Sequence, residues 1–187
     1  MKILLLGNNY LLKYLENKNY SVRNLKNKVN LEQIKNFDFI ISYGYKYIIK
    51  KDIIKFFEKR ILNLHISYLP FNRGADPNLW SVLDETQSGV TIHYMDEFID
   101  TGDILCQKKI ILDYENDTLE TSYLKLTDEI INLFKNNFEK ILNGEIKPQK
   151  QNHNISTMHF LKDRPKNIMP NGWKTKISDI KKLYKDI

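Results

Sequence analysis

Residues 1–17 read MKILLLGNNYLLKYLEN and indicate the fold class of the chain. The apolar run at residues 3–6 has the composition of a strand buried on both faces. Gly7 follows this run, and residues 10–17 have the pattern of a short helix. A strand that leads through a glycine turn into a helix is the first unit expected of an α/β protein with a parallel sheet.

The same alternation of strand and helix continues along the chain. We expect a helix at residues 76–84 with Asp76 as its N-cap before Pro77, and a long helix that opens with a capping box of Asp117 and Glu120 and closes at Gly144. The other expected strands are 20–25, 37–43, 60–66, 90–95 and 105–112, and the other helices are 31–35 and 51–59. The prediction is an α/β fold with a mainly parallel sheet flanked by helices.

The length of 187 residues suits one domain with a small appendage. We place the domain at residues 1–145 and a short C-terminal extension at residues 146–187, which we expect to pack on the core. Cys106 is the single cysteine, so no internal disulfide can form, and we expect it to be a small buried hydrophobe.

The formal net charge of +6 suits an anionic partner, but it does not indicate nucleic acid. Basic residues are spread along the chain, and no run of five or more forms a basic patch. The apolar start lacks a signal-peptide cleavage site, and no stretch reaches the roughly 18 apolar residues of a membrane span. The expectation is a cytoplasmic protein with neither a nucleic-acid nor a membrane partner.

The turn after the first strand does not have a nucleotide-binding pattern. Residues 6–10, LGNNY, match neither the glycine spacing of the dinucleotide fingerprint nor that of the P-loop. We therefore expect Gly7 to serve the turn from strand to helix.

Two polar side chains stand out in residues 62–74, LNLHISYLPFNRG. Asn63 and His65 point to the same face of the expected strand because side chains alternate along a strand. They lie near its carboxyl end, where α/β sheets bind ligands. The alternative is that both side chains satisfy backbone groups of the following loop.

A second polar stretch follows the strand at 90–95 and reads MDEFIDTGDI at residues 95–104. Asp100 precedes Thr101 and Gly102, a tight-turn composition that can aim one carboxylate inward. By itself, Asp-Thr-Gly is usually structural, so its meaning depends on the first stretch.

Together these stretches resemble the folate-dependent formyltransferase family, which includes the methionyl-tRNA, glycinamide ribonucleotide and sugar N-formyltransferases. The resemblance covers about residues 37–112, and order and spacing both match. It implies a Rossmann-like fold in which Asn63, His65 and Asp100 are the catalytic residues. The motifs that carry it are NLHIS at 63–67, LP at 69–70, RG at 73–74, GVTIH at 89–93 and DTG at 100–102.

The resemblance also implies 10-formyltetrahydrofolate as the formyl donor. Tyr43, Gly44 and Tyr45 would border the folate, while Met95 and Asp96 would open the loop whose backbone reads the pterin ring. No metal is expected, because the four histidines show no metal-ligand spacing.

The chemistry fits these residue types. When a neutral amine attacks the formyl carbon, negative charge develops on oxygen and positive charge on nitrogen. Asn63 and a protonated His65 would donate hydrogen bonds to the oxygen, and Asp100 would orient His65 and help to relay the amine proton. His93 points away from Ile92 on its strand, and we interpret it as structural.

Among acceptors, a nucleotide-linked amino sugar of the dTDP type, used in polysaccharide biosynthesis, is the expectation. The tRNA-specific enzymes carry a further C-terminal domain, and the glycinamide ribonucleotide enzymes carry a phosphate loop that residues 7–11 lack. Arg73, Arg164 and Trp173 are the candidate acceptor contacts. The alternative for Arg73 is that it shapes the loop behind the active site, and the alternative for the other two is a surface tail packed on the core.

Other functions stay open from the sequence. Another small amine such as glycinamide ribonucleotide, a formyltetrahydrofolate hydrolase and a non-catalytic folate- or sugar-binding remnant are the alternatives. The oligomeric state is also open, with a homodimer as one alternative.

Overall fold

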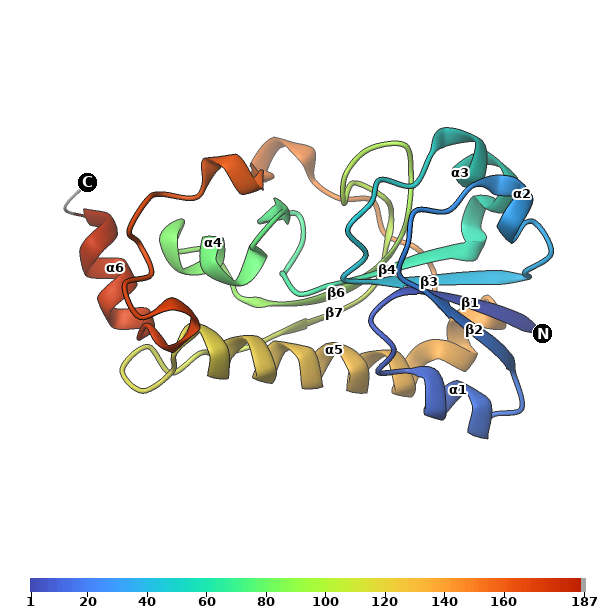
Figure 1. Ribbon diagram of the computed structural model, residues 1–187, viewed down its shortest axis with the longest axis horizontal. Coiled ribbons are helices and arrows are strands. Elements are labelled where there is room, and N and C mark those ends of the chain that lie inside the picture. The colour runs from blue at the N-terminus through green and yellow to red at the C-terminus, as the bar shows by residue number, and fades with distance from the viewer. Residues whose placement is uncertain (186–187) are drawn as a thin grey trace.

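A six-stranded sheet forms the centre of the computed structural model, which describes residues 1–185 (Figure 1). Its strand order is β2-β1-β3-β4-β6-β7, in which the first four strands are parallel and β6 is antiparallel to both of its neighbours, β4 and β7. The predicted mainly parallel α/β sheet is thus confirmed. The strands are β1 (Lys2–Gly7), β2 (Ser21–Leu25), β3 (Phe39–Tyr43), β4 (Ile61–His65), β6 (Gly89–Tyr94) and β7 (Ile104–Lys109).

Helices cover both faces of the sheet. Helices α1 (Leu12–Asn17) and α5 (Leu119–Leu142) lie on one face, and α2 (Leu31–Ile34) and α3 (Lys51–Phe57) lie on the other (Figure 1). Alternate residues of β1 enter the two cores, Leu5 toward α5 and Leu6 toward α3. Because both faces are covered, the strand is apolar at every position and shows no polar alternation.

Helix α5 contributes most to the larger core, so truncation of its buried face should be costly. Phe134 is fully buried and stacks on Phe138 with ring centroids 4.5 Å apart. Phe134→Ala should lower the free energy of unfolding by about 3–5 kcal/mol. The control Leu124→Ala, at a half-exposed position of the same helix, should change it by less than about 0.5 kcal/mol. Urea denaturation measures both, and equal losses would contradict the packing described.

The chain after α5 returns to the body of the protein. In Figure 1 the orange-to-red segment crosses above the sheet and ends in α6 (Ile177–Lys185), which packs against α4 (Pro77–Leu83). On the way, β8 (Met158–His159) pairs in parallel with β5 (Arg73–Gly74). Short 3₁₀ helices lie at η1 (Glu58–Arg60), η2 (His153–Ile155), η3 (Leu161–Asp163) and η4 (Gly172–Lys174).

The starts of α4 and α5 differ from the predictions. Asp76 precedes α4 in a left-handed conformation, and its carboxylate accepts hydrogen bonds from Arg164 and none from the helix. A residue with φ of 50° cannot present its side chain as an extended N-cap does. At α5 the capping box consists of Thr118 and Thr121, one residue later than predicted, and Asp117 accepts a hydrogen bond from the Thr121 hydroxyl.

Cys106 is half-buried beside the larger core. Burial raises the pKa of its thiol to about 11, despite the opposing charge of Lys140. A thiol of that pKa is protonated at neutral pH and is a poor nucleophile. Along residues 1–185, no helix is both long and apolar enough to cross a bilayer.

Candidate active site

Three polar side chains share the sheet face that α2 and α3 cover. Asn63 and His65 point there from β4, and His93 points there from β6, where it lies directly opposite Asn63. The Asn63 Nδ2 and His93 Nε2 atoms are 3.3 Å apart. His93 does point away from Ile92, as predicted, but its own face is the one that carries Asn63. His93 thus contacts the candidate site, and its two ring nitrogens face Tyr94 and Asn63.

Asp100 reaches this group from the loop after β6. Its Oδ1 accepts a hydrogen bond of 2.9 Å from Asn63, and its Oδ2 accepts one of 2.9 Å from the backbone N–H of Gly74. The His93 Nε2 and His65 Nδ1 atoms lie 3.5 and 3.7 Å from its two oxygens. The structure thus brings together the three residues that the sequence singled out.

The surroundings of Asp100 hold it in the ionised form. Burial by itself would raise the pKa of this carboxyl. The charge of His65, the interactions with His93 and the N–H of Gly74 outweigh burial, so the pKa is lowered well below its ordinary value. Asp100 is therefore a permanent negative charge at neutral pH.

The hydrogen-bond network fixes the orientation of the Asn63 amide. His93 donates its Nδ1–H to the Tyr94 carbonyl at 2.8 Å, and in the neutral ring its Nε2 accepts a hydrogen from Asn63. The other Asn63 amide hydrogen goes to Asp100. Both amide hydrogens are engaged, which differs from the predicted role of Asn63 as an oxyanion donor. Its Oδ1 is the atom left to accept a hydrogen bond.

His65 lies with both ring nitrogens toward oxygen atoms. Its Nε2 is 2.9 Å from the Asn72 carbonyl oxygen, and its Nδ1 faces Asp100. An imidazolium, which has a proton on each nitrogen, fits this arrangement. The ring is almost fully buried at the end of β4.

Gly102 allows the Asp100 turn to close against β6. A Cβ there would lie 1.8 Å from the Tyr94 carbonyl oxygen. Gly102→Ala should lower the free energy of unfolding by about 1–3 kcal/mol and should also lower kcat, since the turn that carries Asp100 must move. Gly144→Ala, where φ is 70° and no atom lies within 4 Å, should cost about 1–2 kcal/mol at unchanged kcat. Thermal denaturation and steady-state kinetics separate the two, and unchanged kcat in Gly102→Ala would contradict the close contact.

The residues expected to border a folate lie at two different places. The ring of Tyr43 is buried on the α5 side of the sheet, where its hydroxyl pairs with Thr127 at 2.9 Å, so the ring lies away from Asn63. Burial raises the pKa of this phenol. Gly44 lies at the turn after β3, and the Tyr45 hydroxyl donates to the Asn27 carbonyl.

The loop at residues 95–100 is folded by its own side chains. Met95 packs on the smaller core, and Asp96 accepts hydrogen bonds from the Phe98 N–H and the Thr101 hydroxyl. This leaves Phe98 about 74% exposed.

An ion pair joins this loop to the start of α3. Lys51 and Glu97 form it at 2.5 Å, and Ile48, shortly before α3, is about 77% exposed. The ion pair thus brings the loop at 95–100 next to the start of α3, and Ile48 and Phe98 are the most exposed apolar side chains of these two segments.

The candidate acceptor contacts in the C-terminal segment have partners within the protein. Arg164 pairs with Asp76 at 2.9 Å, next to α4. Trp173 is half-exposed and lies edge-on to Tyr123 of α5, with ring centroids 5.3 Å apart. Neither side chain contacts Asn63, His65 or Asp100 in the hydrogen bonds and ion pairs of residues 1–185.

Arg73 is buried and is bound from the C-terminal segment. Its guanidinium donates to Gln151 Oε1 at 2.6 and 3.2 Å and lies 3.1 Å from His153 Nδ1. Sequence reasoning missed Gln151, which also contacts the Asp100 turn. No local pattern singles out this glutamine.

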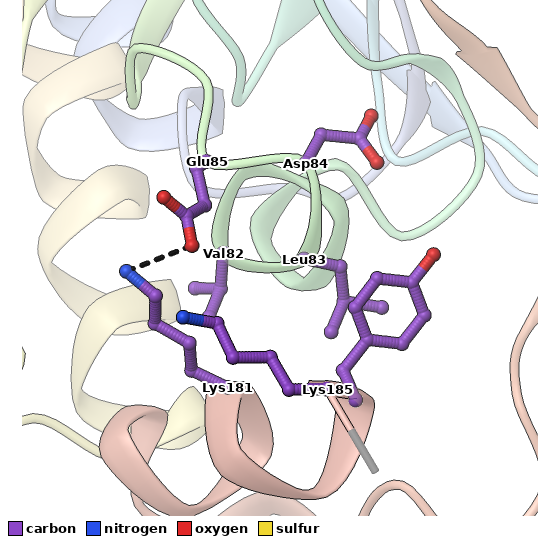
Figure 2. Close-up of a pocket in the computed structure, with 7 residues that line it drawn as sticks. Val82, Leu83, Asp84, Glu85, Lys181 and Lys185 are labelled. Atoms are coloured by element: carbon purple, nitrogen blue, oxygen red, sulfur yellow. Dashed lines mark ion pairs between the residues drawn. The ribbon is translucent and has the colours of Figure 1, made fainter. Parts of the chain in front are cut away.

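Asn63, His65 and Asp100 line neither of two surface cavities formed by residues 1–185. One of about 260 Å³ lies at the carboxyl ends of β1 and β3, where the strand order reverses, and is lined by Gly7, Lys26, Gly44, Lys46 and Tyr47. The other, of about 440 Å³, lies between α4 and α6, where Lys181 pairs with Glu85 (Figure 2). Its lining is Val82, Leu83, Asp84, Glu85, Lys181, Tyr184 and Lys185.

In the part of the chain that the structure describes, no group of three or more His, Cys, Asp or Glu residues is arranged to hold a metal ion. The polar groups that meet at the end of β4 are an amide, two imidazoles and one carboxylate.

Fold and site together define an α/β protein with a buried Asn–His–Asp cluster at the end of a central strand. The family model described as "Formyl transferase" matches residues 7–136. The chain therefore belongs to the formyl transferase family.

Individual relatives are similar over different lengths. The formyltransferase PseJ from Anoxybacillus kamchatkensis is 44% identical, with a TM-score of 0.91 over 96% of this chain and 97% of PseJ. WlaRD, a sugar 3N-formyl transferase, is 27% identical, with a TM-score of 0.71 over 88% of this chain and 71% of WlaRD. A methionyl-tRNA formyltransferase from Fusobacterium nucleatum is 34% identical over 74% of this chain and 45% of its own length. The chain thus spans about half the length of the methionyl-tRNA formyltransferases that it matches.

Proposed function

We propose that this protein transfers a formyl group from 10-formyltetrahydrofolate to the amine of a nucleotide-linked amino sugar. The observation that carries the proposal is the similarity to PseJ along nearly the whole of both chains. The PseJ crystal contains UDP-4,6-dideoxy-4-formamido-L-AltNAc and tetrahydrofolate. This complex favours UDP as the nucleotide carrier over the dTDP expected from the sequence.

The two loops beside α3 support a folate as the formyl donor. Ile48 and Phe98 expose apolar surface on neighbouring loops, and such surface suits a flat heterocycle. When bound there, 10-formyltetrahydrofolate supplies the activated formyl group. The residues that would hold it are Ile48 and those of the loop at 95–100.

The chain's own residues act through orientation and charge. Asn63 Oδ1 would accept a hydrogen bond from the attacking amine, since both amide hydrogens are engaged elsewhere. His65 faces Asp100, and in its protonated form it would stabilise the negative charge that develops on the formyl oxygen. Because its pKa is lowered, Asp100 is a weak base, and it would pass the amine proton to water without retaining it.

Positive charge at the point where the strand order reverses supports an anionic acceptor. Lys26 and Lys46 line the cavity between the carboxyl ends of β1 and β3, the usual place for ligands in open α/β sheets. A diphosphate linking nucleoside and sugar matches this charge.

Methionyl-tRNA is the second candidate acceptor. The similarity to the Fusobacterium nucleatum enzyme over 141 residues favours it. Both candidates require the same donor and the same formyl transfer, so only the acceptor distinguishes them.

The test is an acceptor panel analysed by mass spectrometry. The protein is incubated with 10-formyltetrahydrofolate and, in separate reactions, UDP- and dTDP-linked amino sugars, glycinamide ribonucleotide, methionyl-tRNA or no acceptor. A formyl increment on a UDP-linked amino sugar is expected. An increment on methionyl-tRNA alone would favour the second candidate. Formate release without an acceptor would instead indicate a hydrolase, and ligand binding without turnover would indicate a non-catalytic protein.

A further inference from the structure

Gln151 is a buried amide that ties the returning chain to the Asp100 turn. Its side-chain amide Nε2 donates to the carbonyl oxygens of Asp100 and Gly102, at 2.9 and 2.8 Å. The residue is only 6% exposed. It follows α5 in the sequence, so the C-terminal segment supplies hydrogen bonds that hold a loop between β6 and β7.

The turn that Gln151 holds has a backbone conformation that is uncommon outside glycine. Asp100 has φ of 52°, in the left-handed region that non-glycine residues seldom adopt. Such a conformation persists only where the surrounding contacts determine it. Gln151 supplies two of these contacts, on either side of Thr101.

Arg73 sets the orientation of the Gln151 amide. Its Nε and Nη2 both donate to Gln151 Oε1, so Gln151 must direct Nε2 toward the turn. Arg73 is 4% exposed. Burial lowers the pKa of its guanidinium, while the negative charges of Asp100 and Asp96 oppose that effect.

The residue after Arg73 completes the arrangement. Gly74 donates its N–H to the carboxylate of Asp100, while Gln151 binds the backbone of Asp100. Both ends of the aspartate are therefore held by one unit, made of Arg73, Gly74 and Gln151. Among the hydrogen bonds of residues 1–185, its contact with the loops assigned to the folate is confined to Asp100, the last residue of the loop at 95–100.

We propose that Gln151, oriented by Arg73, is a positioning residue that fixes the Asp100 carboxylate against Asn63 and His65. The inference rests on the proposed formyl transfer. It makes the C-terminal segment a part of the catalytic arrangement, although that segment places no side chain against Asn63 or His65 in the contacts described.

The first test uses a matched pair of charge changes. Gln151→Glu keeps the shape and an acceptor for Arg73 but loses both donors to the turn, whereas Gln149→Glu changes an exposed glutamine two residues earlier. Gln151→Glu should lower kcat by roughly 100-fold, the effect of displacing a catalytic group by about 1 Å. KM for the folate and the acceptor should stay within about twofold, because the change removes an interaction that serves the transition state. Gln149→Glu should behave as wild type.

A double-mutant cycle tests whether Arg73 acts through Gln151. Arg73→Leu should lower kcat in the wild-type background. In a Gln151→Leu background the same change should alter kcat by less than about twofold, since both residues then belong to one broken unit. Additive losses would overturn this step.

Hydrogen exchange gives a measurement that needs no activity. In Gln151→Glu, deuterium uptake by residues 96–103 should be faster by roughly tenfold, for the loss of about two hydrogen bonds, while uptake by α5 should not change. If wild type transfers no formyl group, the proposed function fails. Hydrogen exchange then still tests whether Gln151 holds the Asp100 turn. If wild type is active, and Gln151→Glu has the same kcat and the same rate of deuterium uptake as wild type, only the positioning role fails. Should Gln151→Glu not fold, Gln151→Met carries the same comparison and the same expected results.

Discussion

Asp100→Asn should lower kcat by roughly 10²–10⁴-fold, the range that a positioned acid–base group contributes. The substitution keeps the size of the side chain but removes the negative charge next to His65. It also turns an amide N–H toward Asn63 or Gly74, both of which donate to Asp100. One of the two hydrogen bonds must then break. Steady-state kinetics with 10-formyltetrahydrofolate and the acceptor found in the panel measure the loss.

The matched control for Asp100→Asn is Asp103→Asn. It removes the same charge from the same loop but leaves the contacts of Asp100 in place, and kcat should stay within about twofold of wild type. Comparable losses in both variants would mean that the net charge of the loop matters and the position of Asp100 does not. Wild-type kcat in Asp100→Asn would reject its catalytic role outright.

The same variant predicts a pH dependence of stability. The pKa of Asp100 is lowered in the folded protein, so its ionised form stabilises the fold above the unfolded-state pKa of about 3.9. That contribution is lost as the pH falls through the lower folded-state pKa. The difference in unfolding free energy between wild type and Asp100→Asn should therefore shrink as the pH drops below about 4. Urea denaturation at a series of pH values measures it, and a constant difference would contradict the lowered pKa.

Asn63→Asp should lower kcat by roughly 10²–10³-fold, although it is nearly isosteric. It places a second carboxylate about 2.9 Å from Asp100 Oδ1, where the Asn63 amide now donates. Two carboxylates at that distance cannot both ionise, so one pKa rises strongly and the charge beside His65 changes. The pH dependence of kcat should shift accordingly.

The comparison with Asn63→Ala makes this result specific. Truncation removes the amide without adding charge, so Asn63→Asp should be no more active than Asn63→Ala. Asn137→Asp on α5, where the amide donates to the Leu133 carbonyl, is the charge control and should retain wild-type kcat. If Asn63→Asp were the more active of the two variants at position 63, then the Oδ1 acceptor alone would account for the role of Asn63.

Local patterns in the sequence predicted the sheet and the placement of Asn63 and His65 within the site. Asn63 and His65 share a face because side chains alternate along a strand, and the structure has them on one face of β4. The same rule assigned His93 correctly to the face opposite Ile92. Periodicity does not say which face of a sheet carries a site, so it gave the orientation of His93 but not its contact with Asn63.

The rest of the site depends on contacts between distant parts of the chain. Asp100 was associated with Asn63 only through the family resemblance, because its position depends on a turn that closes against Tyr94. Gln151 lies 51 residues from Asp100 in sequence, and the long helix α5 comes between them. No pattern of propensity or spacing connects residues separated in this way. The Asp76 cap failed for a similar reason, since Arg164 holds that carboxylate from the C-terminal segment.

The return of the chain after α5 has a consequence for the order in which the protein matures. During synthesis, all six strands of the central sheet and α5 are made before Gln151, and domains generally begin to fold from the N-terminal side as they are made. The sheet can thus form while the turn that carries Asp100 still lacks two of its hydrogen bonds. If Gln151 positions Asp100 as proposed, the nascent chain folds its sheet before it can be active. Activity then requires synthesis to have passed residue 151.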